Sequence, residues 1–446
     1  MTVLLRFAPS PTGYLHIGNL RPALINWLVA KKLDGTFLLR FDDTDPERSK
    51  DEYAQAIRED LDWLGLTADR EVKQSDRLEI YRGVEQDLKA RGLLYPCYET
   101  AEELSLKRKV ALSSGRPPVY DRAALKLGDD DRAKFEADGV RPHWRFKLPA
   151  ETVEWDDLIQ GPKSVDLTSQ SDPVLIREDG SPLYTLPSVI DDLEFGVSHI
   201  IRGEDHVTNT AVQIAIIRAL GGTPPIFAHH ALLTGAKGEG LSKRLGSLAI
   251  RSFREAGLEP LAVTSFLAKI GTSDPIEPAA SLDALVESFE FSKLSRAPAR
   301  FDEAELEGLN AKLLHATPFA RVADRLADLG IEGPQAEPFW DLIRANIEKL
   351  SEAKDWWPVV AGGVEPVIED EELTRAAADL VPDEADDETW AALTGALKEQ
   401  TGKKGKALFM PLRLALTGKN HGPELGPLLK LMGSKRARAR LLGHTA

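Results

Sequence analysis

Apolar and polar residues follow two distinct patterns near the N-terminus, one typical of buried strands and one typical of amphipathic helices. Residues 3–8 and 36–41 are short apolar runs, the pattern of buried strands, and Pro9 and Gly13 break the chain after the first run. Between the runs, apolar residues recur at the spacing of a helix face, with Asn19 as a candidate N-cap. The first helical stripe is Leu20, Ala23, Leu24, Trp27 and Leu28, and a second is Tyr53, Ala56, Ile57, Leu61 and Leu64. Strand, crossover helix and strand predict a βαβ unit with a parallel sheet.

Further along the chain these patterns are interrupted and then resume. Residues 85–185 are rich in Lys, Arg, Asp, Gly and Pro, with a short strand at 144–148 and a hairpin turn at 179–180, which indicates an insertion. The pattern becomes helical near residue 315, and prolines and charges divide it near 375. We therefore expect an α/β fold with an α+β insertion and an all-α C-terminal part. The expected segments are 1–84, 85–185, 186–235, 236–314 and 315–446.

Composition narrows the class of protein. The chain has 446 residues, 42% of them hydrophobic, and a net charge of −15, which argues against a uniformly nucleic-acid-binding surface. Basic clusters near the C-terminal end still suit an oriented contact with RNA, although solvated surface is an equally good interpretation. These clusters are Lys403, Lys404 and Lys406, and then Lys435, Arg436, Arg438 and Arg440.

Two other features bear on the cellular location. No apolar stretch approaches the roughly 18 residues that a membrane span needs, and the N-terminus does not resemble a signal peptide. The single cysteine, Cys97, excludes an internal disulfide framework. We expect a cytoplasmic protein without a membrane partner.

The first chemical motif follows the first predicted strand. Residues 6–19 run from a strand into a Pro/Gly loop that opens a helix, and the unpaired N–H groups of a helix N-terminus suit phosphate. Gly18 lets a ligand approach the backbone closely, and His16 can donate to a phosphoryl oxygen. Taken alone, a His-x-Gly tripeptide is more often an incidental loop.

Three further groups carry charge in suggestive places. Residues 240–244 form a Gly-rich stretch in which Lys243 can neutralise charge on phosphates, although surface exposure is the commoner meaning. Asp42 belongs to three carboxylates after a strand that can hold a metal or an ammonium group, or simply cap a helix. Arg202, at the end of another strand, can pair with a ligand carboxylate or form a buried ion pair.

Together these motifs resemble a known family. Residues 6–19 resemble the HIGH signature of class I aminoacyl-tRNA synthetases in the bacterial glutamyl form, and residues 8–13 are similar to the glutamyl/glutaminyl subgroup. Residues 240–244 resemble the KMSKS loop, with Gly240 where the family usually has lysine. Residues 405–418 resemble a stretch near the end of bacterial glutamyl enzymes. The match spans nearly the whole chain.

The resemblance implies roles for individual residues. His16 and Lys243 would be catalytic. The residues that would bind ATP are His16, Gly18, Asp205, His206, Leu233, Lys243 and Arg244, and those that would bind glutamate are Arg6, Ser10, Asp42, Tyr184 and Arg202. Asp42 is one methylene shorter than the glutamate usual in the family. Arg202 favours glutamate over glutamine, because an amide would leave this cation unpaired.

The resemblance also implies the reaction and the partners. The expected substrates are L-glutamate, ATP with Mg²⁺, and tRNA-Glu, with tRNA-Gln as an alternative, joined through a glutamyl-adenylate. The expected architecture is a Rossmann-like domain with an inserted connective domain (85–185), a stem-contact domain (236–314) and a helical anticodon-binding domain, in a monomer. Zinc is not expected, because Cys97 is alone and Glu99 occupies the place of a second cysteine.

Three alternatives remain at this stage. A duplicated enzyme would charge tRNA-Gln with glutamate. A tRNA-binding paralogue with weakened catalysis would explain Gly240 and Asp42. A truncated paralogue that glutamylates a modified tRNA base fits less well, because such proteins lack a region like residues 315–446.

Overall fold

The computed structural model describes residues 3–241 and 248–446, which fall into two units. Residues 1–255 and 263–302 make up the first unit, and residues 256–262 and 303–446 make up the second. This division differs from the boundary at 314/315 that the pattern of residues predicts. In the described part of the chain, no helix is long and apolar enough to cross a membrane.

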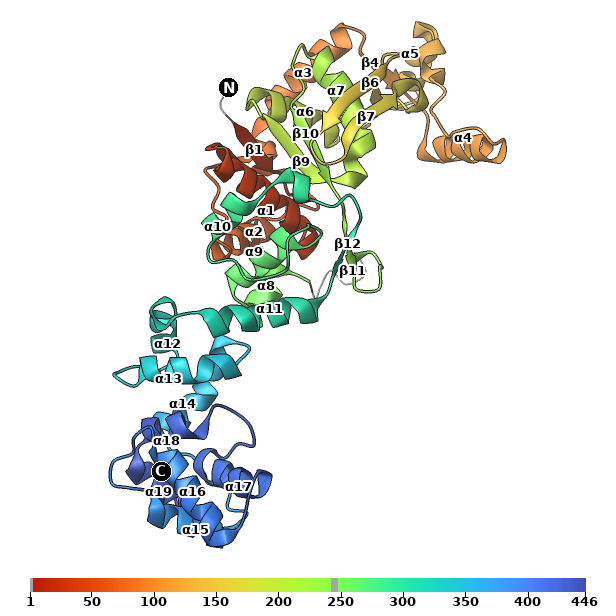
Figure 1. The fold of residues 1–446 in the computed structure, drawn as a ribbon. Helices are drawn as coiled ribbons and strands as arrows, with labels where there is room; N and C mark the ends of the chain where they lie inside the picture. The colour runs from red at the N-terminus through yellow and green to blue at the C-terminus, as the bar shows by residue number, and fades with distance from the viewer. Residues whose placement is uncertain (1–2, 242–247) are drawn as a thin grey trace. The chain divides into compact units, whose positions relative to one another are not determined.

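A seven-stranded sheet organises the first unit (Figure 1). Its order is β3-β2-β1-β9-β10-β6-β7, and every neighbouring pair is parallel except β6 and β7. Strands β1, β2 and β10 are almost fully buried, as expected of a parallel sheet covered on both faces, whereas β9 is buried at its second and third residues. The strands are β1 (Leu4–Phe7), β2 (Thr36–Phe41), β3 (Arg70–Lys73), β6 (Thr152–Asp157), β7 (Gly161–Asp166), β9 (His199–Gly203) and β10 (Ile226–His230).

Helices connect and cover these strands. Helix α1 joins β1 to β2 and buries residues all round its axis, because it packs against β1, β2 and β9 as well as α10. The predicted βαβ unit is therefore confirmed. The helices are α1 (Ile17–Lys32), α2 (Asp51–Trp63), α3 (Leu78–Ala90), α6 (Thr185–Glu194), α7 (Val207–Ala219), α8 (Ile250–Glu255) and α10 (Leu282–Ser288); α9 (Pro260–Lys269) crosses the 262/263 boundary.

Residues 85–185 do not share one sheet. Strands β4 (Leu94–Cys97), β5 (His143–Phe146) and β8 (Val174–Ile176) form a small antiparallel sheet, and helices α4 (Ala101–Ser113) and α5 (Asp129–Ala137) bury no residue. The turn at 179–180 is confirmed, because the backbone N–H of Arg177 donates to the carbonyl of Ser181 and Gly180 has a φ of 84°. Strands β6 and β7, in contrast, extend the main sheet.

The second unit is helical and encloses one cluster of buried apolar residues that extends from Leu314 to Leu441. This cluster continues on both sides of residue 375. Strands β11 (Leu233–Gly235) and β12 (Ala299–Phe301) pair in the first unit. The helices of the second unit are α11 (Glu303–Ala316), α12 (Ala323–Asp328), α13 (Ala336–Ile343), α14 (Ala353–Ala361), α15 (Glu371–Leu380), α16 (Thr389–Thr401), α17 (Lys406–Thr417), α18 (Leu425–Met432) and α19 (Ser434–Leu441).

Candidate active site

A cavity of about 480 Å³ opens at the carboxyl edge of the main sheet. Strand β1 is flanked by β2 on one side and by β9 on the other, so the chain changes direction along the sheet between β1 and β9. Ligands of open parallel sheets bind outside the carboxyl ends of strands at such a point. The cavity is lined by eight of the residues singled out from the sequence: Arg6, Ser10, Gly18, Asp42, Tyr184, Arg202, Asp205 and His206.

The loop after β1 leads directly into the start of α1. His16, rather than Asn19, is the N-cap, so the prediction for Asn19 is wrong. The backbone N–H of Gly18 donates to Nδ1 of His16 over 3.1 Å, and a Cβ on Gly18 would lie only 3.0 Å from the His16 ring. Glycine at this position therefore makes room for the capping imidazole. Because Nδ1 accepts, the neutral ring carries its proton on Nε2, and burial lowers the pKa of His16.

Residues 248–250, which follow the second motif in the sequence, lie beside the start of α1. The backbone N–H of Ile17 donates to the carbonyl of Leu248 over 3.1 Å, and the N–H of Ile250 donates to the carbonyl of Leu15 over 2.8 Å. These two bonds join residues 248–250 to the N-terminus of α1 and the loop before it. Lys243 and Arg244 themselves lie outside the described residues.

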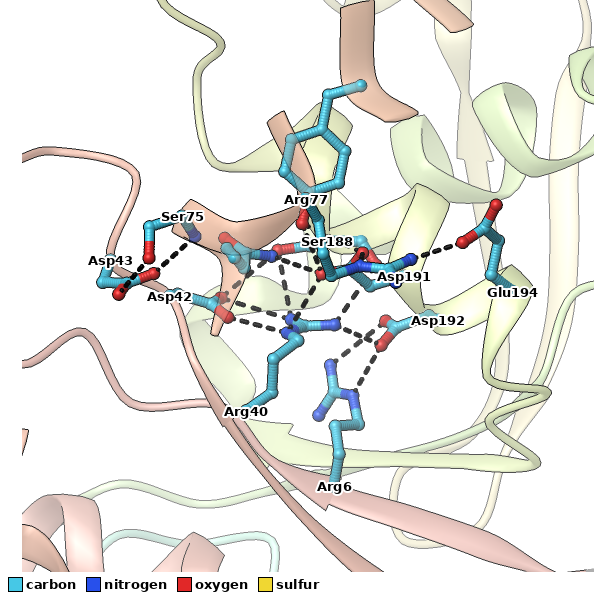
Figure 2. Close-up of polar contacts among 12 residues, drawn as sticks. Arg6, Arg40, Asp42, Asp43, Ser75, Arg77, Ser188, Asp191, Asp192 and Glu194 are labelled. Carbon is cyan, nitrogen blue, oxygen red and sulfur yellow. Dashed lines mark hydrogen bonds and ion pairs between the residues drawn. The ribbon is translucent and has the colours of Figure 1, made fainter. Parts of the chain in front are cut away.

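Two arginines and two aspartates form a balanced ion cluster, and three of them, Arg6, Arg40 and Asp42, line the cavity (Figure 2). Asp192 accepts from Nε of Arg6 at 3.1 Å and from Nη1 of Arg40 at 2.8 Å. Asp42 accepts hydrogen bonds from Nε and Nη2 of Arg40, at 2.7 and 3.2 Å. Burial works to lower the pKa of Arg40, but the charges of Asp42 and Asp192 raise it above the ordinary arginine value. Each guanidinium in this cluster thus has a carboxylate of its own.

A second layer of polar residues supports this cluster from α6, from α3 and from the 3-10 turn at Gln74–Arg77 that precedes α3. Asp191 accepts from Nε of Arg77 at 2.8 Å, from Gln74 at 2.9 Å and from the hydroxyl of Tyr81, and Arg77 also donates to Glu194 (Figure 2). Asp191 is fully buried. The neighbouring Asp191 and Asp192 are therefore held in place by partners on two sides of α6.

Arg202 differs from the other cavity arginines. Its Nη2 donates to Thr210 Oγ1 at 2.6 Å and to Gln213 Oε1 at 2.7 Å, and its Nε faces His229 Nε2 at 3.3 Å. Among the described residues no carboxylate pairs with it, and burial lowers its pKa to about 10. Arg202 is thus a desolvated cation with only neutral partners, at the edge of a cavity large enough for a small anion.

The remaining expected site residues lie at different depths. Tyr184 is exposed, and its hydroxyl accepts from Asn209 at 2.7 Å. Asp205 contributes an exposed carboxylate beside Gly203, where a Cβ would lie 2.5 Å from the Asp205 oxygen. Leu233 is buried in β11 and does not line the cavity, whereas Leu232 does. His16 also lies outside the cavity lining.

The acidic stretch after β2 does not converge on one point. Asp42 faces Arg40, Asp43 accepts from the backbone N–H and hydroxyl of Ser75 at 2.8 Å each, and Asp45 accepts from the backbone N–H of Arg48. Over residues 3–241 and 248–446, no group of three His, Cys, Asp or Glu side chains could hold a metal ion. Cys97 is buried 3.7 Å from the hydroxyl of Tyr120, and burial raises its pKa to about 11.

Several residues around Arg202 were not predicted from the sequence as part of the site. His229 and Asp157 are both buried, and His229 Nδ1 lies 2.5 Å from Asp157 Oδ2. Thr210 and Gln213 interrupt the apolar sequence of α7, which was a usable signal, as was the polar pair 229–230 closing an apolar strand. Asp157 gave no such signal, because its role depends on the pairing of β6 with β10.

Part of the C-terminal basic cluster is used inside the protein. Lys403 pairs with Asp370, and Arg438 donates to Asp383 at 2.9 Å. Arg440 is fully buried and donates to main-chain oxygens. These three cations therefore have partners within the helical unit.

Known proteins share both the sequence and the fold. The family model of tRNA synthetases class I (E and Q), catalytic domain, matches residues 2–308, and that of an anticodon binding domain matches residues 369–444. The chain is 57% identical to glutamate–tRNA ligase 2 of Methylorubrum populi over 99% of both chains, and 55% identical to glutamate–tRNA ligase 1 of Brucella canis over 99% and 100%.

Among solved structures, a glutamate tRNA ligase from Elizabethkingia meningosepticum, crystallised with its amino acid, is 26% identical, with a TM-score of 0.85 over 99% of this chain and 98% of that one. The matches extend over the sheet and its cavity as well as the helical unit. The chain therefore belongs to the class I tRNA synthetases of the E and Q group.

Proposed function

We propose that this protein attaches L-glutamate to tRNA in an ATP-dependent, two-step reaction. The observation that carries the proposal is Arg202, a half-buried cation without a carboxylate among its described partners at the edge of the cavity. A substrate with a side-chain carboxylate would complete this ion pair, whereas glutamine would leave the cation uncompensated. The glutamate–tRNA ligase names of relatives at 55–57% identity support the same substrate.

In the first step the α-carboxylate of glutamate attacks the α-phosphorus of ATP. The bond to the bridging oxygen breaks, pyrophosphate leaves and glutamyl-adenylate remains. We place the side-chain carboxylate of glutamate against Arg202, with Arg6 and Tyr184 beside it, and its ammonium group near Asp42 and Ser10. Asp42 already has Arg40 as a partner, so it contributes less net charge than a free carboxylate would.

ATP enters as its Mg²⁺ complex and places its phosphates at the N-terminus of α1. Gly18 exposes backbone N–H groups there, and His16 holds its Nε2 proton available as a donor. Asp205, His206 and Leu233 would surround the nucleoside part. Lys243 and Arg244 would neutralise the charge that develops on the leaving pyrophosphate. The described residue Leu248, which follows this stretch in the sequence, is bonded to Ile17 at the same helix N-terminus.

In the second step a hydroxyl of the terminal ribose of tRNA attacks the carbonyl carbon of the adenylate and AMP leaves. No protein nucleophile is required. The anticodon-binding match at 369–444 supports contact with the anticodon arm, and we assign residues 85–185 and 236–314 to the acceptor arm. We expect the protein to act as a monomer.

One experiment tests the amino acid and the tRNA together. The purified chain is incubated with ATP, Mg²⁺ and either glutamate or glutamine, with separately transcribed tRNA-Glu or tRNA-Gln, and both pyrophosphate exchange and charged tRNA are measured. We expect pyrophosphate exchange with glutamate and not with glutamine, and only when tRNA is present. We also expect tRNA-Glu to be charged.

Charging of tRNA-Gln alone would instead identify a duplicated enzyme. The reaction with tRNA-Gln is therefore measured separately. The two relatives named above are called ligase 2 and ligase 1. Binding of tRNA without any exchange would overturn the proposal in favour of a binding protein.

A further inference from the structure

The guanidinium of Arg202 is oriented by acceptors that carry no charge. Its Nε points at His229 Nε2 at 3.3 Å, so this nitrogen must be unprotonated if it accepts. The hydroxyl of Thr210 lies 2.9 Å from the same nitrogen and 2.6 Å from Nη2 of Arg202. The geometry around Arg202 therefore depends on which nitrogen of His229 carries the proton.

Asp157 fixes that choice. Its Oδ1 accepts from three backbone N–H groups, those of Ile159 at 3.0 Å, Gln160 at 2.8 Å and His229 at 3.1 Å. Its Oδ2 is left to face Nδ1 of His229 at 2.5 Å. Burial works to raise the pKa of Asp157, but these hydrogen bonds lower it to about 2. A carboxylate at this point keeps the proton of His229 on Nδ1.

Three adjacent strands supply the chain of contacts. In the sheet, β10 lies between β9 and β6, His229 is paired with Arg202, and Phe227 is paired with Asp157. Asp157 and His229 are fully buried, with side-chain exposures of 0%. A carboxylate placed directly on Arg202 would neutralise it, whereas a carboxylate acting through a neutral imidazole orients the guanidinium and leaves its charge for a ligand.

We propose that Asp157 and His229 are positioning residues that hold Arg202 as an uncompensated cation and thereby help select glutamate over glutamine. The proposal rests on the proposed function of Arg202 as the partner of the substrate side chain. It adds two residues, Asp157 from β6 and His229 from β10, which act through Arg202 and not by contact with glutamate or ATP.

The decisive variant is Asp157→Asn. The three backbone N–H groups hold the amide oxygen, so the amide NH₂ faces His229 Nδ1, which must then accept. The proton of His229 moves to Nε2 and points at Arg202. We expect the KM for glutamate to rise ~10-fold or more, the KM for ATP to change less than ~2-fold, and the preference for glutamate over glutamine in kcat/KM to fall.

A spectroscopic readout separates this role from a structural one. In the full-length protein labelled with ¹⁵N-histidine, the His229 resonances should change from an Nδ1–H to an Nε2–H pattern in Asp157→Asn. The matched control is Asp156→Asn, an exposed neighbour on the same strand, which should change neither spectrum nor kinetics. A changed tautomer with an unchanged KM for glutamate would overturn the proposal, and so would equal increases in both KM values.

A second pair of variants covers a failure of Asp157→Asn to fold. His229→Gln keeps an acceptor that can reach Arg202, and His229→Leu removes it. We expect glutamate affinity within ~3-fold of the parent for the first and at least ~10-fold weaker for the second, and equal behaviour of the two would contradict the proposal. If Arg202→Met leaves glutamate binding intact, the proposed role of Arg202 as the partner of the substrate side chain fails, whatever these variants show.

Discussion

Arg202 in the sheet unit is half-buried and Arg440 in the helical unit is fully buried, and desolvation lowers the pKa of each to about 10. Their surroundings differ. Arg440 donates to carbonyl oxygens of Pro358, Val359 and Gly362 at the end of α14, of Leu416 at the end of α17, and of Ala446. Arg202 donates to side chains and lines a cavity.

The difference shows how a structural buried charge is told from a functional one. The carbonyl groups at a helix C-terminus carry partial negative charge and lack helical partners, so they suit a guanidinium permanently. Arg440 therefore satisfies the ends of two helices at once. The neutral acceptors around Arg202 orient it but supply no opposite charge, so its ion pair is completed only by a ligand.

The largest expected effect is on stability, from Arg440→Met. The change removes every hydrogen bond that this side chain donates and leaves buried carbonyl oxygens without donors. We expect a loss of about 4 kcal/mol or more in the unfolding free energy of the helical unit. Hydrogen exchange followed by mass spectrometry should show the loss in residues 303–446, with glutamate activation unchanged at low temperature. Uniform destabilisation of both units would contradict this assignment.

The same substitution at Arg202 should act on binding instead. Arg202→Met should raise the KM for glutamate ~100-fold, about 3 kcal/mol, because the substrate carboxylate would lose its only buried partner without a competing carboxylate. ATP binding should be unchanged, and the unfolding midpoint should fall by no more than about 3 °C. Unchanged glutamate affinity, measured by pyrophosphate exchange, would remove Arg202 from the substrate site.

Asp60 on α2 supplies a buried charge of the opposite sign. Neither carboxylate oxygen has a hydrogen-bond partner among the described residues, the nearest cation is Arg254 at 3.9 Å, and burial raises the pKa of Asp60 to about 6. The pKa of Asp60 is higher in the folded protein than in the unfolded chain, so ionisation of Asp60 lowers the stability of the fold. This loss of stability increases between about pH 4 and pH 6 and reaches its full size above pH 6.

Asp60→Asn should therefore raise the unfolding free energy of the sheet unit by about 2 kcal/mol at pH 7.5 and by almost nothing at pH 4. Denaturant melts at the two pH values, with glutamate KM as the control, test this expectation. An equal gain at both pH values would mean that the unpaired charge is not the cause. Asp60 does not line the cavity, so the KM should not move.

The smallest effect should come from Thr210→Val, which keeps the shape of the side chain and removes one neutral acceptor of Arg202. We expect the KM for glutamate to rise ~5-fold, about 1 kcal/mol. The matched control is Thr208→Val. Thr208 lies on the same helix, and the described structure shows no hydrogen bond between it and Arg202. An effect at position 210 as large as that of Arg202→Met would show that the hydroxyl, not the charge, dominates.

Local patterns predicted the parts of the fold that depend on local physics. The strands at 4–7 and 36–41 and the helix between them follow from apolar spacing alone. The start of α1 was misplaced by three residues, because the pattern does not reveal that an imidazole can serve as the cap. Leu233 was singled out from the sequence, whereas its neighbour Leu232 lines the cavity, because successive side chains of an extended segment point to opposite faces.

The non-local parts were beyond such patterns. Nothing near Asp157 indicates that β6 joins the main sheet beside β10, because this pairing joins segments about 70 residues apart and is set by tertiary packing. The neutral surroundings of Arg202 arise from the same pairing, together with α7. Sequence motifs thus located the cavity, while the residues that orient its charges required the three-dimensional structure.

The lone thiol of the chain has a practical consequence. Cys97 is sealed in a strand of the small antiparallel sheet and holds its proton far above neutral pH. A maleimide reagent should therefore leave the native protein unlabelled. A cysteine introduced at any surface position becomes a unique attachment point for a fluorophore, so pairs of dyes on protein and tRNA can report their approach without first removing a native residue.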